Sequence, residues 1–215
     1  MTATDAKPAP VWLGVLGRRT AGVLAIAVGL YGLAYLARGA GAFPPGVGDN
    51  AAGGLILVAH ASLAGIALAS GPWQFIAPWR YKGRRPHRWI GRVYVIACLL
   101  GGLAGAALAW GTTSGPVARF GFLGLALAWL VSTALGWRHA RQRNFVEHRR
   151  WMIRSFVLTF AAVTLRIYLP IAAVAGLDFA VAYPAIAWLC WVPNLIAAEL
   201  WLRARPLPAP GAIRG

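Results

Sequence analysis

Six long apolar runs dominate the chain, and short polar segments separate them. The runs lie at residues 20–37, 51–77, 89–112, 118–137, 151–176 and 183–202. Each run approaches or exceeds the roughly 20 residues that an α-helix needs to cross a bilayer. The apolar residues follow one another without alternation, which favours transmembrane helices over the strands of a barrel. The pattern therefore predicts an all-α integral membrane bundle of six transmembrane helices, with the second to fifth spans as its core.

Basic residues predict the orientation of this bundle. Of the 21 Lys and Arg residues, eighteen fall on one side of the six-span pattern, in residues 1–19, 80–92, 138–154 and 203–214. The other side has only Arg38 and Arg119, and Arg166 lies inside a span. Because loops rich in Lys and Arg stay in the cytoplasm, both chain ends are predicted to be cytoplasmic. Residues 1–17 would form the N-terminal tail, 18–204 the membrane domain, and the proline-rich residues 205–215 a disordered C-terminal tail.

A second interpretation of the first run stays open. Ala40-Gly41-Ala42 follows this run and resembles a signal-peptidase site. Cleavage there would leave five spans and an external N-terminus. The length of the run and of the tail before it favours a first span that is retained.

Composition agrees with a membrane location. The chain is 59% hydrophobic and 12% charged, whereas soluble proteins are about 25% charged. The net charge of +16 comes from clusters at the ends of spans, so topology explains it and nucleic acid is not an expected partner. We expect the cytoplasmic arginine clusters to contact anionic lipid headgroups. Cys98 and Cys190 lie in apolar runs and are interpreted as small core side chains.

Two hairpins of the pattern resemble each other. Residues 87–94 read HRWIGRVY and residues 148–156 read HRRWMIRSF. With one inserted Arg, they share the pattern His-Arg-Trp-x-x-Arg-x-aromatic at the cytoplasmic start of an outward-going span. The repeat predicts a core of two pseudo-symmetric hairpins, and sites often lie where such repeats meet. Shared topology alone is the alternative explanation.

Ionisable residues inside spans are costly, so they are the first candidates for a site. Arg166 lies about 22 Å along the fifth span, at 1.5 Å per residue, and therefore in the outer leaflet. It either binds a carboxylate, a haem propionate or a quinone carbonyl, or it pairs with Asp49 or Asp178 of an external loop. His60 is predicted at a similar level in the second span, where it would hydrogen-bond a neighbouring helix, ligate haem or relay protons.

Three histidines, His87, His139 and His148, cluster on the cytoplasmic side of the pattern. Imidazole is a good axial ligand for haem, and the neighbouring arginines would suit its propionates. The alternative is a solvated or lipid-facing role for all three. Their spacing does not favour zinc, because no carboxylate or close ligand pair accompanies them.

The sixth span carries Pro193, which is predicted to kink it. Asn194 and the carbonyls freed by the kink would line a polar cavity. Alternatively, the span is a packing helix in which Glu199 pairs with an arginine near the cytoplasmic surface. In the third span, Gly101 and Gly105 form a small-xxx-small pair that lets helices approach closely. The sequence has no phosphate-binding glycine loop and no hydrolase or zincin motif.

Residues 53–200 resemble a family of predicted bacterial membrane proteins designated domain of unknown function 2306. The resemblance rests on His60 with Gly65, on GPWQF at 71–75, on residues 87–94 and 148–154, and on TLR at 164–166. It implies a multi-span protein of the bacterial inner membrane without an established activity. The recurrent residues of the family map to His60, Gln74, His87, Arg92, His148, Arg149 and Arg166.

The chain is also similar to cytochrome b561-type proteins, which have six helices and bind haem. Those proteins carry paired histidines near both membrane faces, whereas here only His60 lies on the outer side. This departure argues against two haems but not against a single haem.

These observations establish no activity, and the first of three hypotheses is a redox membrane protein that binds one b-type haem or a quinone. The predicted cofactor-binding residues are His60, His87, His148 and Arg166, with His87 and His148 as a haem ligand pair and His60 with Arg166 as an outer polar site. The alternatives are a small-solute transporter or channel, and a non-catalytic scaffold or accessory subunit. Enzymatic activity, metal binding and oligomeric state stay open.

Overall fold

The computed structural model describes residues 11–44, 47–75 and 84–204. The predictions about the first ten residues, the loop at 76–83 and the C-terminal tail fall outside these residues. The described residues form helices and no strands. Six helical stretches are long and apolar enough to cross a membrane, at 19–38, 54–75, 85–110, 115–141, 145–174 and 179–204. The prediction of an all-α bundle with six transmembrane helices is therefore confirmed.

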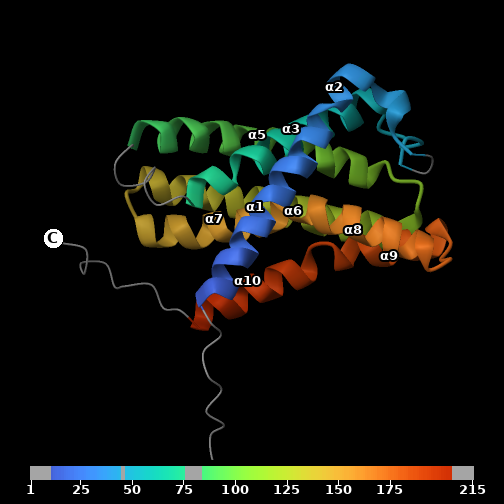
Figure 1. Ribbon diagram of the computed structural model, residues 1–215. Helices are drawn as coiled ribbons and strands as arrows, with labels where there is room; N and C mark the ends of the chain where they lie inside the picture. The colour runs from blue at the N-terminus through green and yellow to red at the C-terminus, as the bar shows by residue number, and fades with distance from the viewer. Residues whose placement is uncertain (1–10, 45–46, 76–83, 205–215) are drawn as a thin grey trace, which may run out of the picture.

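The spans are built from helices of different lengths (Figure 1). The first contains most of α1 (Val11–Leu33) and α2 (Tyr35–Arg38), followed by the short η1 (Ala40–Ala42). The next three are α3 (Gly54–Ser70) with η2 (Pro72–Phe75), α5 (Arg84–Trp110) and α6 (Gly115–Arg141). The last two spans are each interrupted, as α7 (Phe145–Thr159) with α8 (Ala161–Val174), and as α9 (Phe179–Leu189) with α10 (Val192–Ala204).

Two helices begin earlier than the apolar pattern predicts. The apolar runs start at Trp89 and Trp151, whereas α5 starts at Arg84 and α7 at Phe145. Arginine is a good helix former, so basic residues extend a helix into the interface without adding apolar character. The side chain of Asn144 also caps α7 by accepting a hydrogen bond from the Glu147 amide at 3.3 Å.

The interruption of the sixth span follows from Pro193. The chain leaves the helical path at Cys190 and Trp191, because the proline has no N–H and its ring clashes with the carbonyl four residues earlier. The fifth span is interrupted at Phe160. Thr164 donates from Oγ1 to the Cys190 carbonyl, and Asn194 donates to the same carbonyl at 3.0 Å. Side chains therefore satisfy the backbone where the two broken spans meet.

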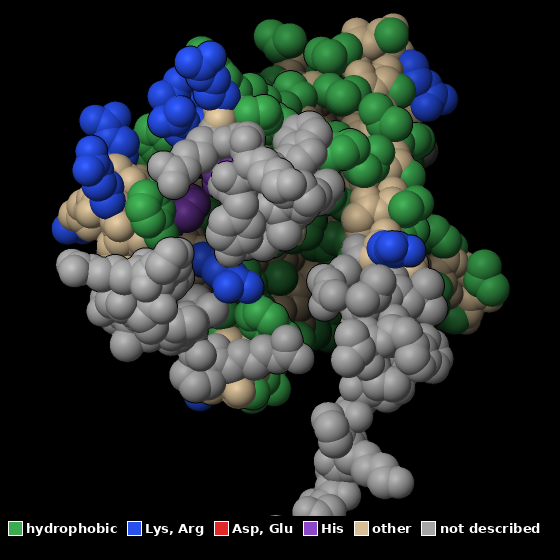
Figure 2. Space-filling view, turned by 60° about the vertical axis from the view of Figure 1, so that its left-hand side comes forward, with side chains coloured by type: hydrophobic (Ala, Val, Ile, Leu, Met, Phe, Trp, Pro, Cys, Tyr) green, Lys and Arg blue, Asp and Glu red, His purple; other side chains and the backbone are tan. Residues whose placement is uncertain are grey.

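The helices pack as two extensive pairs, α3 with α5 and α6 with α7. The contact between α5 and α6 joins the two pairs. In Figure 1, α1 crosses the other helices obliquely, packing mainly against α3. The antiparallel order brings the start of α5, the end of α6 and the start of α7 to one end, which we call the basic end. Figure 2 shows Lys and Arg side chains gathered there, with a histidine between them.

Three glycines let α1 approach α3 closely, and we call Gly29, Gly32 and Gly65 the glycine seam. A Cβ atom added to Gly65 would lie 2.6 Å from the Gly29 carbonyl oxygen, and one added to Gly32 would lie 2.7 Å from the Ala61 carbonyl oxygen. Both distances are too short for real atoms, so the two backbones meet only because side chains are missing. The sequence pointed to a different pair, Gly101 and Gly105 on α5. A Cβ added to Gly101 would lie 3.3 Å from Leu63 Cβ and 3.5 Å from the Ala64 amide nitrogen, and one added to Gly105 would lie 2.9 Å from the His60 ring, so this pair lets α5 approach α3.

Buried hydroxyl groups link α5, α6 and α7 in what we call the hydroxyl network. The Tyr94 hydroxyl lies 2.9 Å from both Ser155 Oγ and Thr159 Oγ1. Trp129 Nε1 donates to Thr159 Oγ1 at 2.9 Å, and Thr133 Oγ1 lies 2.7 Å from Ser155 Oγ. All five side chains are buried. Because no water is available in the bilayer core, each polar atom here depends on another for its hydrogen bond.

A bidentate ion pair fastens α10 to α7 near the basic end. Arg154 donates from Nε to Glu199 Oε1, and from its terminal nitrogen to Oε2 at 3.0 Å. This pair confirms the interpretation in which Glu199 binds an arginine. Because both side chains remain partly exposed, Glu199→Gln is expected to lower the free energy of unfolding by only about 1 kcal/mol.

Unfolding in mixed micelles with increasing dodecyl sulfate measures this effect. The control is Glu147→Gln, which removes the pair between Glu147 and Arg150 within one helix. Such pairs contribute only about 0.2–0.5 kcal/mol. Equal midpoints for the two variants would mean that the Arg154–Glu199 pair does not hold α10.

Candidate functional site

Arg166 lies inside the fifth span, in α8, and the side chain is only partly buried by protein. One terminal nitrogen donates to the carbonyl of Ala162, one turn earlier in the same helix, at 3.0 Å. The guanidinium carbon lies 5.6 Å from the ring centroid of Tyr31, which belongs to α1. Arginine has five N–H donors, so these contacts leave most of its donors available.

No ion pair between the described residues includes Arg166. Among the described residues, the ion pairs are Glu147 with Arg150 and Glu199 with Arg154. Asp178 accepts a hydrogen bond from the Ala180 amide at 2.8 Å and so caps α9. The interpretation in which Arg166 pairs with Asp178 or Asp49 therefore finds no such pair within the part of the chain that the structure describes.

Two tyrosines face Arg166 from the first span. The hydroxyls of Tyr31 and Tyr35 lie 3.0 Å apart, and their rings meet edge to face. The ring of Tyr35 also stacks on Phe43, with centroids 3.7 Å apart. Arg166 interacts electrostatically with both tyrosines. The glycine seam fixes α1 against α3 in the same stretch, so the seam positions both tyrosines relative to Arg166.

His60 reaches the same region from α3. Its Nδ1 lies 2.8 Å from the Gly101 carbonyl oxygen on α5, and a carbonyl only accepts, so Nδ1 carries the proton in this contact. Nε2 is then the acceptor nitrogen. The ring packs over Gly105, where a Cβ would meet it at 2.9 Å. The positive charge of Arg166 is near enough to act on the His60 ring. The two residues of the expected outer polar site therefore lie in one region of the bundle.

We call Tyr31, Tyr35, His60 and Arg166 the arginine site. His60 lies six residues inside α3 and Arg166 eight residues from the end of α8, which is roughly 9 Å and 12 Å at 1.5 Å per residue. Both therefore lie at a similar depth below the end opposite the basic end. The site offers a charged fork of donors, two hydroxyls and one acceptor nitrogen. This combination suits a carbonyl or carboxylate oxygen.

The histidines of the basic end have other partners. His148 Nδ1 lies 2.8 Å from the Gly136 carbonyl oxygen, so it joins α7 to α6. With its amide nitrogen oriented toward α5, Gln74 donates to His87 Nδ1 at 2.9 Å and to the His87 carbonyl at 3.2 Å. His148 interacts electrostatically with His139, whose Nδ1 is buried without a hydrogen-bond partner.

These contacts bear on the predicted haem ligand pair. The bonds of His87 run to η2, whereas those of His148 run to α6. Within the described residues, no group of three or more His, Cys, Asp and Glu side chains is placed to hold a metal ion. The pairing of His87 with His148 stays a prediction.

A family model described as "Predicted membrane protein (DUF2306)" matches residues 57–202, which is more than half of the chain. The chain belongs to this family. Comparisons with curated proteins and with solved structures find no match.

The DUF2306 region contains part of the arginine site. His60 and Arg166 lie inside residues 57–202, whereas Tyr31 and Tyr35 lie outside it. The first span thus completes the site of this DUF2306 protein from beyond the matched region. Sequence reasoning missed both tyrosines, because a Tyr in an apolar run is ordinary at a membrane interface. Their spacing of four residues, which places both on one helix face, was the available signal.

Proposed function

We propose that this DUF2306 protein binds the oxygen-bearing head of a lipophilic small molecule at the arginine site, and that the ligand is a quinone. The observation that carries the proposal is Arg166, an arginine within a span that pairs with no carboxylate among the described residues. A charge at this depth is costly unless a partner compensates it. A quinone carbonyl would accept hydrogen bonds from the guanidinium without bringing a second charge into the bilayer.

The surroundings favour a ligand that arrives from the lipid. Tyr31 is 45% exposed, and Leu30 and Ile167 beside the site are 57% and 43% exposed. On a membrane-spanning surface, exposed apolar side chains contact lipid tails. A ligand with an isoprenoid tail would lie along these side chains while its head reaches Arg166. A water-soluble carboxylate gains nothing from such a surface.

Substitution of Arg166 is expected to lower the affinity of the protein for a quinone. Arg166→Gln is expected to weaken the binding of a short-tailed ubiquinone at least tenfold, because a hydrogen bond to a charged group contributes about 1.5–3 kcal/mol. Arg166→Lys, which keeps the charge but loses the planar fork, should fall between the two. Quenching of tryptophan fluorescence during titration of the protein in lipid nanodiscs gives the dissociation constants.

Arg141→Gln is the matched control, because Arg141 is exposed at the basic end, whereas the arginine site lies near the opposite end of the bundle. It should bind the quinone as the wild type does. Unchanged affinity in Arg166→Gln, with a melting temperature equal to that of the wild type, would refute the proposal.

An optical spectrum of the purified protein, oxidised and then reduced with dithionite, distinguishes haem binding from quinone binding. A Soret band with sharpened α and β bands would support a b-type haem. His→Ala changes at His60, His87 and His148 would then identify its ligands. A spectrum without these bands leaves the quinone as the ligand to test.

Transport of a small solute is the second candidate function, and the interrupted fifth and sixth spans favour it. Broken helices near the membrane midplane often line the binding sites of transporters. Here Asn194 bridges the two breaks, donating to Thr164 Oγ1 at 3.3 Å and to the Cys190 carbonyl at 3.0 Å. Flux into proteoliposomes that is lost in Asn194→Leu would favour transport over quinone binding.

We also propose a location for the protein, in the bacterial inner membrane with the basic end in the cytoplasm. The arginines that gather at this end (Figure 2) support the orientation, because positively charged loops are retained there. They would contact anionic lipid headgroups.

A further inference from the structure

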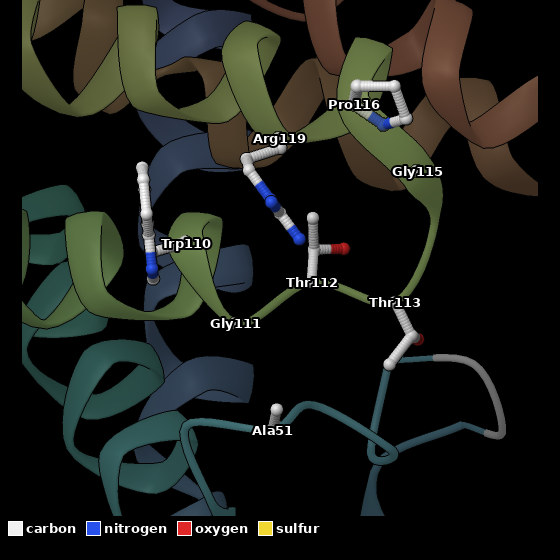
Figure 3. Close-up of a pocket in the computed structure, with 8 residues that line it drawn as sticks. All are labelled: Ala51, Trp110, Gly111, Thr112, Thr113, Gly115, Pro116 and Arg119. Atoms are coloured by element: carbon white, nitrogen blue, oxygen red, sulfur yellow. The ribbon is translucent and has the colours of Figure 1, made fainter.

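A second polar site lies at the end of the bundle opposite the basic end. A pocket of about 470 Å³ opens between the turn that joins α5 to α6 and the segment before α3. Ala51, residues 110–113, Gly115, Pro116 and Arg119 line it (Figure 3). The Ala51 amide donates to the Gly111 carbonyl at 3.0 Å, and the Asn50 side chain donates to the Leu108 carbonyl at 2.8 Å. These bonds hold the two walls of the pocket together.

Arg119 is the cation of this pocket. Figure 3 shows its side chain extending from α6 toward Thr112. Its guanidinium carbon lies 5.5 Å from the Trp110 ring centroid. Its Nε is buried and has no hydrogen-bond partner. Neither ion pair between described residues includes Arg119. An enclosed N–H without an acceptor is costly, and an anion bound in the pocket would satisfy it.

The rest of the lining suits a tetrahedral anion. Thr112 accepts the Ser114 amide on its Oγ1 at 3.3 Å, which leaves the proton of that hydroxyl to be donated. Thr113 adds a second, exposed hydroxyl. No carboxylate is among the lining residues. Guanidinium groups bind phosphate oxygens through paired hydrogen bonds. The lining therefore favours a phosphate group over a cation or an apolar ligand.

The position of the pocket favours a lipid as the source of that phosphate. The pocket lies where α5 ends and α6 begins, and Trp110, Val117 and Phe120 beside it are 66%, 55% and 59% exposed. Tryptophan is enriched at the level of the headgroups, and the exposed apolar side chains of α6 continue from there along the span. A phospholipid would place its phosphate at Arg119 and its tails along these side chains.

We propose that the Arg119 pocket binds a phosphate group, as the headgroup of an anionic phospholipid or as free phosphate. This site is separate from the arginine site, and its binding would bring one specific lipid or ion to the outer end of the α5–α6 pair. The proposal does not depend on quinone binding. Either proposal can therefore fail without the other.

Native mass spectrometry of the detergent-solubilised protein, titrated with phosphatidylglycerol, tests the lipid source. Arg119→Gln is expected to reduce the fraction of protein with one tightly bound lipid at least tenfold. Arg119→Lys, which retains a cation, should retain part of the binding. The matched control is Arg38→Gln, because Arg38 is the other arginine of this end and is exposed. It should leave the bound fraction unchanged.

Calorimetric titration with inorganic phosphate tests the other source. Phosphate binding that Arg119→Gln abolishes, together with unchanged lipid binding, would assign the pocket to free phosphate. If Arg119→Gln changes neither titration while its melting temperature matches that of the wild type, the proposal is overturned and Arg119 contacts only Trp110. If Arg119→Gln fails to fold, Arg119→Lys is titrated instead, because it keeps the positive charge. Partial loss of binding would then support the proposal, and binding equal to that of the wild type would overturn it.

Discussion

Gly65→Val is expected to lower the free energy of unfolding by about 3 kcal/mol, the upper part of the usual range for an overpacked contact. A Cβ at Gly65 would lie 2.6 Å from the Gly29 carbonyl oxygen and 3.2 Å from the Leu33 amide nitrogen. Both are backbone atoms and cannot rotate away. The only relief is for α1 to move off α3, which would carry Tyr31 and Tyr35 away from Arg166.

Two measurements check this prediction. Unfolding in mixed micelles gives the loss of stability, and quinone titration gives the loss of the arginine site. Gly41→Val is the control, because a Cβ there would meet no atom within 4 Å. If Gly65→Val unfolds at the same midpoint as the control variant, α1 does not pack on α3 as described.

Thr159→Val is expected to cost about 2 kcal/mol, since interhelical hydrogen bonds in membranes average roughly 0.6 kcal/mol and orphaned polar groups add to that cost. The change keeps the shape of the side chain but removes the oxygen at the centre of the hydroxyl network. Trp129 Nε1 then loses its acceptor, and Tyr94 retains only Ser155. Both groups would remain buried in a region without water.

The same unfolding assay measures this effect, with Thr113→Val as the control. Thr113 is exposed in the turn between α5 and α6, so its change should cost less than about 0.5 kcal/mol. A double variant, Thr159→Val with Tyr94→Phe, should cost less than the sum of the single changes, because both remove the same bond. Strict additivity would mean that the two hydroxyls do not interact.

The sequence predicted the parts of the fold that depend on apolar length and on backbone chemistry. Continuous apolar runs identified the six spans, and Pro193 identified the break before α10. Helices α5 and α7 begin at Arg84 and Phe145, several residues before the apolar runs, because an arginine-rich helix end looks polar in the sequence. Glu199 was expected beside an arginine, and the partner is Arg154.

The candidate site was predicted only in part. Arg166 and His60 stand out, because each is an ionisable residue inside an apolar run. Tyr31 and Tyr35 do not, since their role depends on how α1 crosses α3. That crossing follows from the glycine seam, and its three glycines are indistinguishable in the sequence from the many other glycines of the chain. The hydroxyl network was missed for a related reason, because Ser, Thr and Tyr are common in spans and only the packing shows that they meet.

The quinone proposal is tested most directly by photo-crosslinking. An azido-quinone with a short tail would be illuminated in nanodiscs that contain the wild-type protein or Arg166→Gln, and the labelled peptides would be sequenced. The account predicts label on the segments that carry Tyr31, His60 and Arg166 in the wild type, with competition by unlabelled quinone and at least tenfold less label in the variant. Label spread evenly over the lipid-facing residues of all six spans, or equal label in the wild type and Arg166→Gln, would contradict it.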